Sequence, residues 1–174
     1  MNIKESLNQL FAHIYKGNEQ AITLSHQLWD VAQTLDDFYD DDPVSKPDVY
    51  KFALNTMFNI PNCQLAIAVG LNHHLLGVFL RWVDANTIEQ DENRTKEDLI
   101  KAYMLRAGIY DIFVIIAYYL HGADWAFEIG PIVRRYYGEI FSEYESEIGY
   151  ARSSNRDDST SERRGINLEC KQTK

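Results

Sequence analysis

Acidic residues gather near position 40, in the segment LDDFYDDD. Asp36, Asp37 and Asp40 form the pattern DDxxD, and residues three or four positions apart share one face of a helix. Like charges so close destabilise a helix, and a helix C-terminus disfavours anions. A bound Mg²⁺ would offset both effects, because Mg²⁺ is held by carboxylates together with substrate phosphates. We therefore predict these three residues as metal ligands, with a solvated helix end before a turn as the alternative.

Two further carboxylates interrupt apolar helical faces. Asn86 and Glu89 lie on the same helical stripe as neighbouring apolar side chains. Asp111 stands inside an apolar run, just over one helical turn after Arg106. Because a buried carboxylate is costly without a partner, each acid needs a cation, a metal or a hydrogen-bond donor. We predict Glu89 and Asp111 as catalytic groups. Arg106 and Asn86 are the predicted substrate-binding groups, since a guanidinium suits a phosphate.

The sequence does not decide between two arrangements of these groups. In one, the five carboxylates converge on a pocket between helices, as carboxylates from facing helices do in the metal sites of helical bundles. In the other, Arg106 or Arg81 pairs with Asp111 or Glu89 in a structural network. The first arrangement favours an enzyme, and the second favours a site that only holds the fold together.

Helical periodicity runs through the body of the chain, without the alternation of β-strands. Gly17, Gly70 and Pro61 interrupt the pattern, and Thr95 with Asp98 resembles a capping box. We expect the apolar stretch from position 103 onward to be the most buried. The sequence predicts an all-α, single-domain bundle of about six to eight helices. The longer helices are expected over residues 18–39, over 62–90 with an interruption at Gly70, and over 96–120, and two short ones near 123–137 and 139–150, the first bent or split by Gly130–Pro131.

Composition limits the classes of protein and of partner. The chain has 174 residues and carries a formal charge of −9. Its hydrophobic content of 45% excludes a wholly disordered chain, and its two cysteines are too few for a disulfide scaffold. An acidic chain is a poor ligand for nucleic acids or anionic membranes. The longest apolar run, 112–120, is far shorter than the roughly 20 residues of a membrane span. We therefore expect a soluble protein that binds a small phosphorylated ligand or a protein partner, in an oligomeric state that the sequence leaves open.

The cysteines and the two ends of the chain add little chemistry. Cys63 and Cys170 have no second Cys or His at metal spacing, which favours a reduced, intracellular protein. The amphipathic N-terminus does not resemble a signal peptide. Residues 151–174 are polar and contain six bases and four acids, so we predict a disordered basic tail after a helical domain over 1–150.

Several blocks of the sequence resemble a family of small helical proteins of tailed bacteriophages. Those proteins carry a Trp-Asp-Asp-x-x-Asp motif followed by Pro-Val-Ser, which LDDFYDDDPVSKPDVYKFAL resembles with Leu35 in the place of Trp. The later blocks RWVDANTIE, LRAGIYD and HGADWAFEIGPIVRRYY are also similar, so the resemblance covers about residues 20–145. It implies a phage or prophage origin and a setting in the host cytoplasm, and it implies no particular activity.

The acidic segment also resembles motifs of Mg²⁺-dependent enzymes. Asp36-Asp37-x-x-Asp40 is similar to the first aspartate-rich motif of class I isoprenoid synthases, which bind diphosphate through Mg²⁺. Glu89-Gln-Asp-Glu92 has the ExxE spacing of the all-α nucleotide pyrophosphatases. These resemblances imply Mg²⁺ as the cofactor and a diphosphate or a nucleotide as the substrate.

The sequence therefore leaves hypotheses from different classes. The first is a Mg²⁺-dependent enzyme whose metal polarises phosphoryl oxygens. The alternative is a non-enzymatic phage accessory protein that binds a host or virion protein through its acidic surface. A third is an oligomeric structural component. Carboxylates that converge inward favour the enzyme, and carboxylates that spread outward favour the binding protein.

Overall fold

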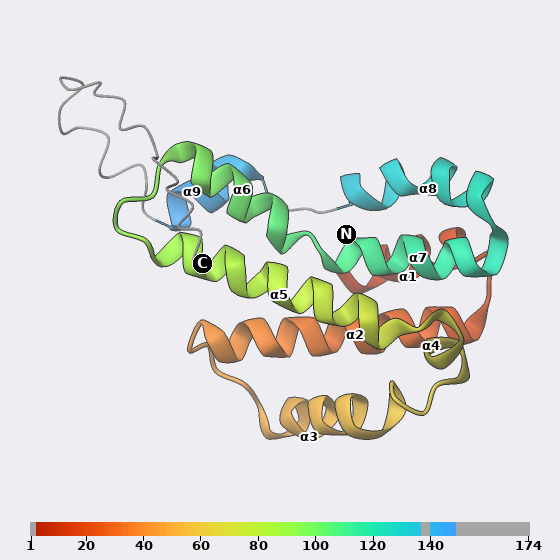
Figure 1. The fold of residues 1–174 in the computed structure, drawn as a ribbon. Coiled ribbons are helices and arrows are strands. Elements are labelled where there is room, and N and C mark those ends of the chain that lie inside the picture. Colours follow the sequence, from red (N-terminus) through yellow and green to blue (C-terminus); the bar gives the residue numbers. More distant parts are fainter. Residues whose placement is uncertain (1–2, 137–139, 149–174) are drawn as a thin grey trace, which may run out of the picture.

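The computed structural model describes residues 3–136 and 140–148, and every regular element within them is helical (Figure 1). The all-α fold predicted from the sequence is therefore confirmed. The tail predicted for 151–174 lies outside the described residues. In the described part of the chain, no helix combines the length and the apolar character that a membrane crossing requires. The elements in chain order are α1 (Ile3–Ile14), α2 (Glu19–Tyr39), α3 (Lys46–Leu54), the π-helical η1 (Asn55–Asn59), α4 (Gln64–Val69), α5 (Leu71–Gln90), α6 (Lys96–Arg106), α7 (Ile109–His121), α8 (Ala123–Arg135) and α9 (Phe141–Glu147).

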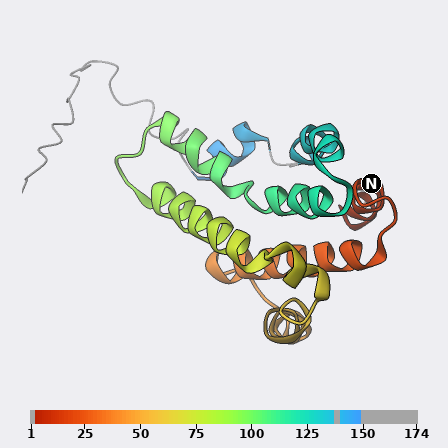
Figure 2. The same cartoon turned by 45° about the vertical axis from the view of Figure 1, so that its right-hand side comes forward.

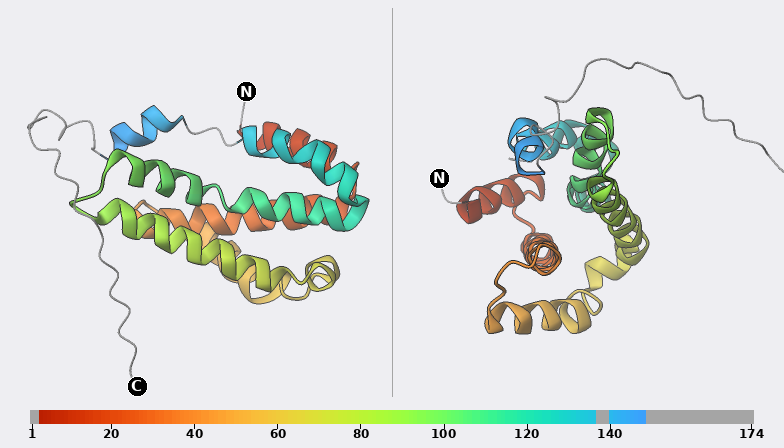
Figure 3. Two further views of the ribbon diagram at one scale, coloured as in Figure 1. Left: turned by 45° about the horizontal axis from the view of Figure 1, so that its top comes forward. Right: turned by 90° about the vertical axis from the view of Figure 1, so that its left-hand side faces the viewer.

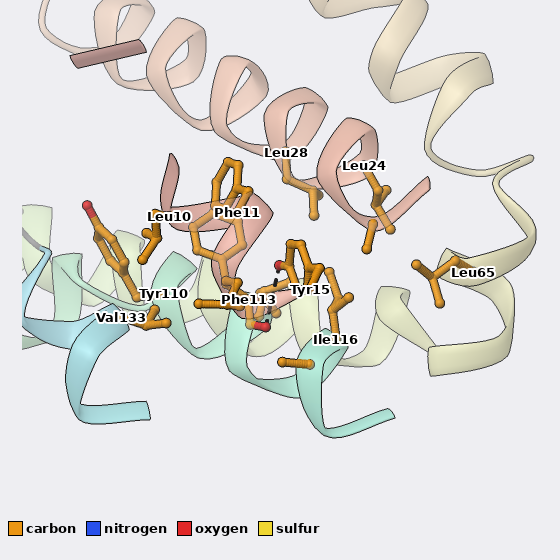
Figure 4. Packing of buried hydrophobic residues seen from close by; sticks show 14 of the residues in the cluster. Leu10, Phe11, Tyr15, Leu24, Leu28, Leu65, Tyr110, Phe113, Ile116 and Val133 are labelled. Carbon is orange, nitrogen blue, oxygen red and sulfur yellow. Dashed lines mark hydrogen bonds between the residues drawn. The ribbon is translucent and has the colours of Figure 1, made fainter. Parts of the chain in front are cut away.

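The main core lies where α1, α2 and α7 meet (Figure 4). Phe11 and Phe113 pack edge to face with ring centroids 4.9 Å apart, and Leu24 and Ile116 are fully buried beside them. The Tyr15 hydroxyl lies 2.6 Å from Ser25 Oγ, so the hydroxyl is satisfied inside the core. Burial raises the pKa of Tyr15. As expected from its apolar sequence, α7 contributes many of the fully buried side chains.

Long helices lie side by side around α2. Helix α5 runs alongside α2, and α3 with η1 lies on another side of it (Figure 2). The end-on view in Figure 3 places α1, α5 and α3 around α2. None of the described residues of α3 is buried, so this helix adds little to the core. The core and the long helices thus leave α3 and η1 at the margin of the molecule.

Local signals set several helix boundaries. The Asn18 side chain accepts a hydrogen bond from the backbone N–H of Ala21 at 3.0 Å and caps α2. Thr95 and Asp98 form the predicted capping box at the start of α6. Gly70 adopts a left-handed conformation with φ of 67°, which ends α4 and begins α5. These boundaries agree with the sequence prediction.

The helix predicted over 96–120 is wrong in one respect, because it is two helices. α6 ends at Arg106 and α7 begins at Ile109, with Ala107 and Gly108 between them. Gly108 is packed against α5, and a Cβ added to it would lie 3.5 Å from Val78 Cγ1. Glycine is a poor helix former, and it stands at this break. In contrast, α8 continues through Pro131, where a bend or a split was predicted.

Candidate functional site

Arg106 at the end of α6 is the centre of a polar cluster. Its Nε and one terminal nitrogen donate to the two carboxylate oxygens of Glu89, each at 2.7 Å. The same terminal nitrogen donates to Asn86 Oδ1 at 2.8 Å, and the other donates to Asp36 Oδ1 at 3.2 Å. The hydrogen bonds that Arg106 donates to Glu89, and then the negative charges of Glu89 and Asp36, raise the pKa of Arg106. The guanidinium thus joins α2, α5 and α6 and stays charged.

Two aromatic residues complete this cluster, and the sequence prediction did not include them. Trp82 Nε1 donates to Asp36 Oδ1 at 3.0 Å, and the Tyr144 hydroxyl donates to Glu89 Oε1 at 2.5 Å. Trp82 lies one turn before Asn86 on the stripe that was already noted, so that stripe was a usable signal. Tyr144 comes from α9, 55 positions after Glu89, and no local pattern indicates this contact.

The buried position of Asn86 and Glu89 was predicted correctly. Asn86 is 2% exposed and Glu89 is 9% exposed, on the inner face of α5. Glu89 accepts hydrogen bonds from both Arg106 and Tyr144, so its burial is compensated. The sequence left open, as its second arrangement, a structural network in which an arginine pairs with Asp111 or Glu89. The pair of Arg106 with Glu89 is such a network.

The aspartates at the end of α2 lie in different surroundings. Asp36 is held by Trp82 and Arg106, Asp37 is half-buried, and Asp40 is exposed at the C-cap of the helix. Partial burial of its carboxyl group, and then the negative charge of Asp36, raise the pKa of Asp40. A carboxylate in this position gains from a nearby cation.

These carboxylates do not fit a preformed Mg²⁺ site. Asp36 Oδ1 already accepts two hydrogen bonds, from Trp82 and Arg106. Over residues 3–136 and 140–148, no group of three or more His, Cys, Asp or Glu side chains is placed to hold a metal ion. The Mg²⁺ cofactor therefore stays a prediction from the sequence, and no catalytic step is derived through it.

Asp111 belongs to a second, separate network. Its two oxygens accept from Arg81 at 2.8 Å and from Arg134 at 2.7 Å, so it links α5, α7 and α8. The predicted pairing is confirmed, with Arg81 as one of the two partners. The prediction that it is buried is wrong, because its side chain is 29% exposed. Asp111 therefore does not join Glu89 and Asp36 in one pocket.

A cleft of about 790 Å³ opens beside the Arg106 cluster. Its body is apolar and is formed by residues of α2, α5 and α7, among them Leu28, Trp29, Val78, Phe79 and Ile109. Among the described lining residues, the charged groups are one guanidinium, that of Arg106, and the carboxylates of Asp36, Asp40, Asp42, Glu89 and Glu147. Asp37 and Asp111 do not line it. An apolar cleft of this size with a few convergent polar groups is typical of a binding site.

The charges of the cleft determine what it can bind. The Arg106 guanidinium already donates to Glu89, Asn86 and Asp36, so a phosphate would have to displace carboxylates to reach it. The remaining acids repel an anion and attract a cation. The site is therefore suited to a ligand with an apolar body and positive charge.

Comparison of the chain with models of protein families, with curated proteins and with solved structures gave no match.

Proposed function

We propose that this protein is a non-enzymatic accessory protein of phage type, which binds a basic, amphipathic segment of a host or virion protein in the host cytoplasm. The observation that carries the proposal is the cleft beside Arg106, which combines an apolar body with an excess of carboxylates. Apolar side chains of the partner would enter the cleft, and its Lys or Arg side chains would meet the acids at the rim.

The length of the cleft supports a protein segment as the ligand. The residues of α5 that line it extend from Asn72 to Glu89, which is about 25 Å along a helix axis. A groove of this length suits one face of a helix, whose apolar side chains recur every three or four residues. The cleft reaches η1 near Thr56 and reaches α9 near Glu147, so it continues across several elements.

The charge of the cleft supports a basic partner. Asp40 and Asp42 line the cleft next to Asp36, and the raised pKa of Asp40 reflects partial burial and this negative charge. A Lys or Arg at this position would offset the repulsion. The formal charge of −9 on the whole chain would also favour encounter with a basic partner.

The proposal is tested with a designed helical peptide that has Leu on one face and Lys on the other, and with a matched peptide that has Glu in place of Lys. Trp29 and Trp82 line the cleft, so their fluorescence reports binding. The third tryptophan, Trp125, donates to the Ile14 carbonyl at 2.8 Å, away from the cleft. We expect saturable binding of the Lys peptide, weakened by salt, and no binding of the Glu peptide.

Matched variants at the end of α2 make the test specific. Asp40→Asn with Asp42→Asn removes two acids that line the cleft, whereas Asp37→Asn with Asp41→Asn removes two acids from the same segment that do not. We expect the first pair to weaken peptide binding by about tenfold and the second to change it much less. Equal effects of the two pairs would mean that only net charge attracts the peptide, which contradicts binding in the cleft.

A Mg²⁺-dependent enzyme acting on a diphosphate or a nucleotide is the second candidate function. The observation that favours it is that Asp36, Asp40 and Asp42 all line the cleft, where a divalent cation would stabilise their carboxylates. Arg106 and Asn86 would then bind the substrate, and Glu89 would act as the catalytic group, whereas Asp111 lies outside this cleft. The engagement of Arg106 by Glu89 and the distinct network of Asp111 favour the binding protein over the enzyme.

A further inference from the structure

One face of α5 carries an apolar stripe that is open to solvent. Leu76, Phe79, Leu80 and Val83 are 58%, 47%, 53% and 39% exposed and recur at helical spacing. We call these four residues the α5 stripe. Leu76, Leu80 and Val83 do not line the cleft, whereas Phe79 belongs both to this stripe and to the cleft lining. A contiguous apolar patch on a surface marks a place where another molecule packs.

Gly77 lies beside the α5 stripe and leaves room for a close approach of a second helix. A glycine inside a helix is less favourable than an alanine, so its presence calls for a reason. A Cβ added to Gly77 would meet nothing within 4 Å among the described residues, so packing within the chain does not require a glycine there. A large side chain from another molecule fits over such a position.

We propose that α5 packs antiparallel against α5 of a second copy of this chain, across a two-fold axis midway between Gly77 and Leu80. Leu80 of each copy then lies over Gly77 of the other copy. The same axis places His73 opposite Asp84, because the two pairs share one midpoint in the sequence. All four positions lie toward the open face of α5 in a helical projection.

Charge complementarity favours the antiparallel arrangement. Of the titratable side chains of α5, His73, His74 and Asp84 are exposed, whereas Arg81 pairs with Asp111 and Glu89 is buried against Arg106. Antiparallel packing places His73 of one helix opposite Asp84 of the other and opposes the two helix dipoles. A two-fold interface requires a surface that complements itself, and this helix has that property.

The size of the surface determines the strength of the dimer. A helix of 20 residues is about 30 Å long, so one helix face gives less than the roughly 800 Å² per partner of a standard interface. We therefore expect a weak dimer, with a dissociation constant in the micromolar range, that forms as the concentration rises.

Sedimentation velocity of the full chain over about 5–500 µM tests the proposal, and we expect a monomer–dimer equilibrium. Leu80→Glu should raise the dissociation constant at least about tenfold. Met104→Glu is the matched control, because Met104 is 66% exposed on α6 and lies outside the α5 stripe. The control should dimerise like the parent protein.

Gly77→Ala separates the dimer from the fold. Alanine favours a helix more than glycine does, so this variant should unfold at a higher temperature when dilute and monomeric. It should nevertheless dimerise more weakly, because its Cβ occupies the place of Leu80 from the second copy. Unchanged dimerisation of Gly77→Ala would contradict the proposed approach of the two helices.

A charge exchange tests the orientation. His73→Asp and Asp84→Lys should each weaken the dimer, and the double variant should restore it. A double variant that stays weak would overturn the antiparallel pairing, and a parent chain that stays monomeric up to the highest concentration would overturn the dimer. None of the substituted residues lines the cleft, so peptide binding should be unchanged in every variant. The outcome for the dimer is therefore independent of the outcome for the proposed function.

Discussion

Arg106 shows how one side chain connects elements that are distant in the sequence. Its planar guanidinium offers donors in fixed directions, and Glu89 takes two of them in a bidentate pair. The donors that remain reach Asn86 and Asp36. A lysine has one charged nitrogen and does not reproduce this geometry. Because Glu89 is 9% exposed, the pair is a structural contact whose loss is costly.

Arg106→Met should therefore destabilise the protein by about 3–5 kcal/mol, because Glu89 loses its charged partner inside the fold. The double variant with Glu89→Met should lose less than the sum of the two single variants, since two apolar residues then replace the ion pair. Urea denaturation of the four proteins gives the coupling free energy. Additive effects would contradict the contact between the two residues.

Asp40 gives a prediction about pH. Partial burial and the charge of Asp36 raise the pKa of Asp40 in the folded protein, so its ionised form opposes folding at neutral pH. This unfavourable contribution disappears as the pH falls through the ordinary range of an aspartate. Asp40→Asn should stabilise the protein at pH 7 by at most about 0.5 kcal/mol, because solvent screens this exposed group, and the difference should vanish near pH 3. Thermal unfolding at both pH values measures it, and a difference that persists at low pH would assign the effect to something other than ionisation.

At the scale of the element, the boundaries set by local chemistry were predictable. Asn18 before α2, Gly70 between α4 and α5, and Thr95 before α6 act through hydrogen bonds or backbone angles within a few residues. The break at Gly108 was not predicted, although glycine is a poor helix former, because the apolar pattern continues across it. Helical periodicity alone therefore predicted one continuous helix where the protein has α6 and α7.

In the candidate site too, the features set by local spacing were predictable and the long-range contacts were not. Asn86 and Glu89 were expected on the inner face of α5 from their spacing, and they lie there. The contact from Tyr144 depends on where α9 folds back, and the second partner of Asp111, Arg134, comes from α8. Such long-range contacts leave no mark in the local pattern of one sequence.

The start of α6 allows a test of local helix stability. Thr95 accepts from the Asp98 backbone N–H at 3.2 Å, and the side chain of Asp98 accepts from the Thr95 backbone N–H at 3.0 Å. Thr95→Ala removes the cap and should cost about 1 kcal/mol of folding free energy. Thr95→Ser keeps a hydroxyl and should cost much less, as measured by chemical denaturation. Equal losses in the two variants would show that the methyl group of Thr95 matters more than its hydroxyl.

At the scale of the whole molecule, we propose separate roles for two surfaces on α5. The inner side of the helix faces the Arg106 cluster and the cleft, and the outer side carries the α5 stripe. A dimer through the outer side would leave the acids of the cleft free for a basic partner. Two clefts on one dimer would also raise the apparent affinity for a partner that presents two segments.

Calorimetric titration with Mg²⁺ at fixed ionic strength separates the two candidate functions. Asp36 already accepts hydrogen bonds from Trp82 and Arg106, and Asp40 is exposed, so we expect no saturable heat from Mg²⁺ alone at millimolar concentration. A solvated helix end predicts a small, non-saturating salt effect that is similar in the parent protein and in Asp37→Asn with Asp40→Asn. A saturable heat in the parent protein that is lost in the double variant would establish a metal site instead. Repeating the titration with inorganic diphosphate covers a site that a phosphate completes, and a heat seen only with both components would favour the Mg²⁺-dependent enzyme over the binding protein.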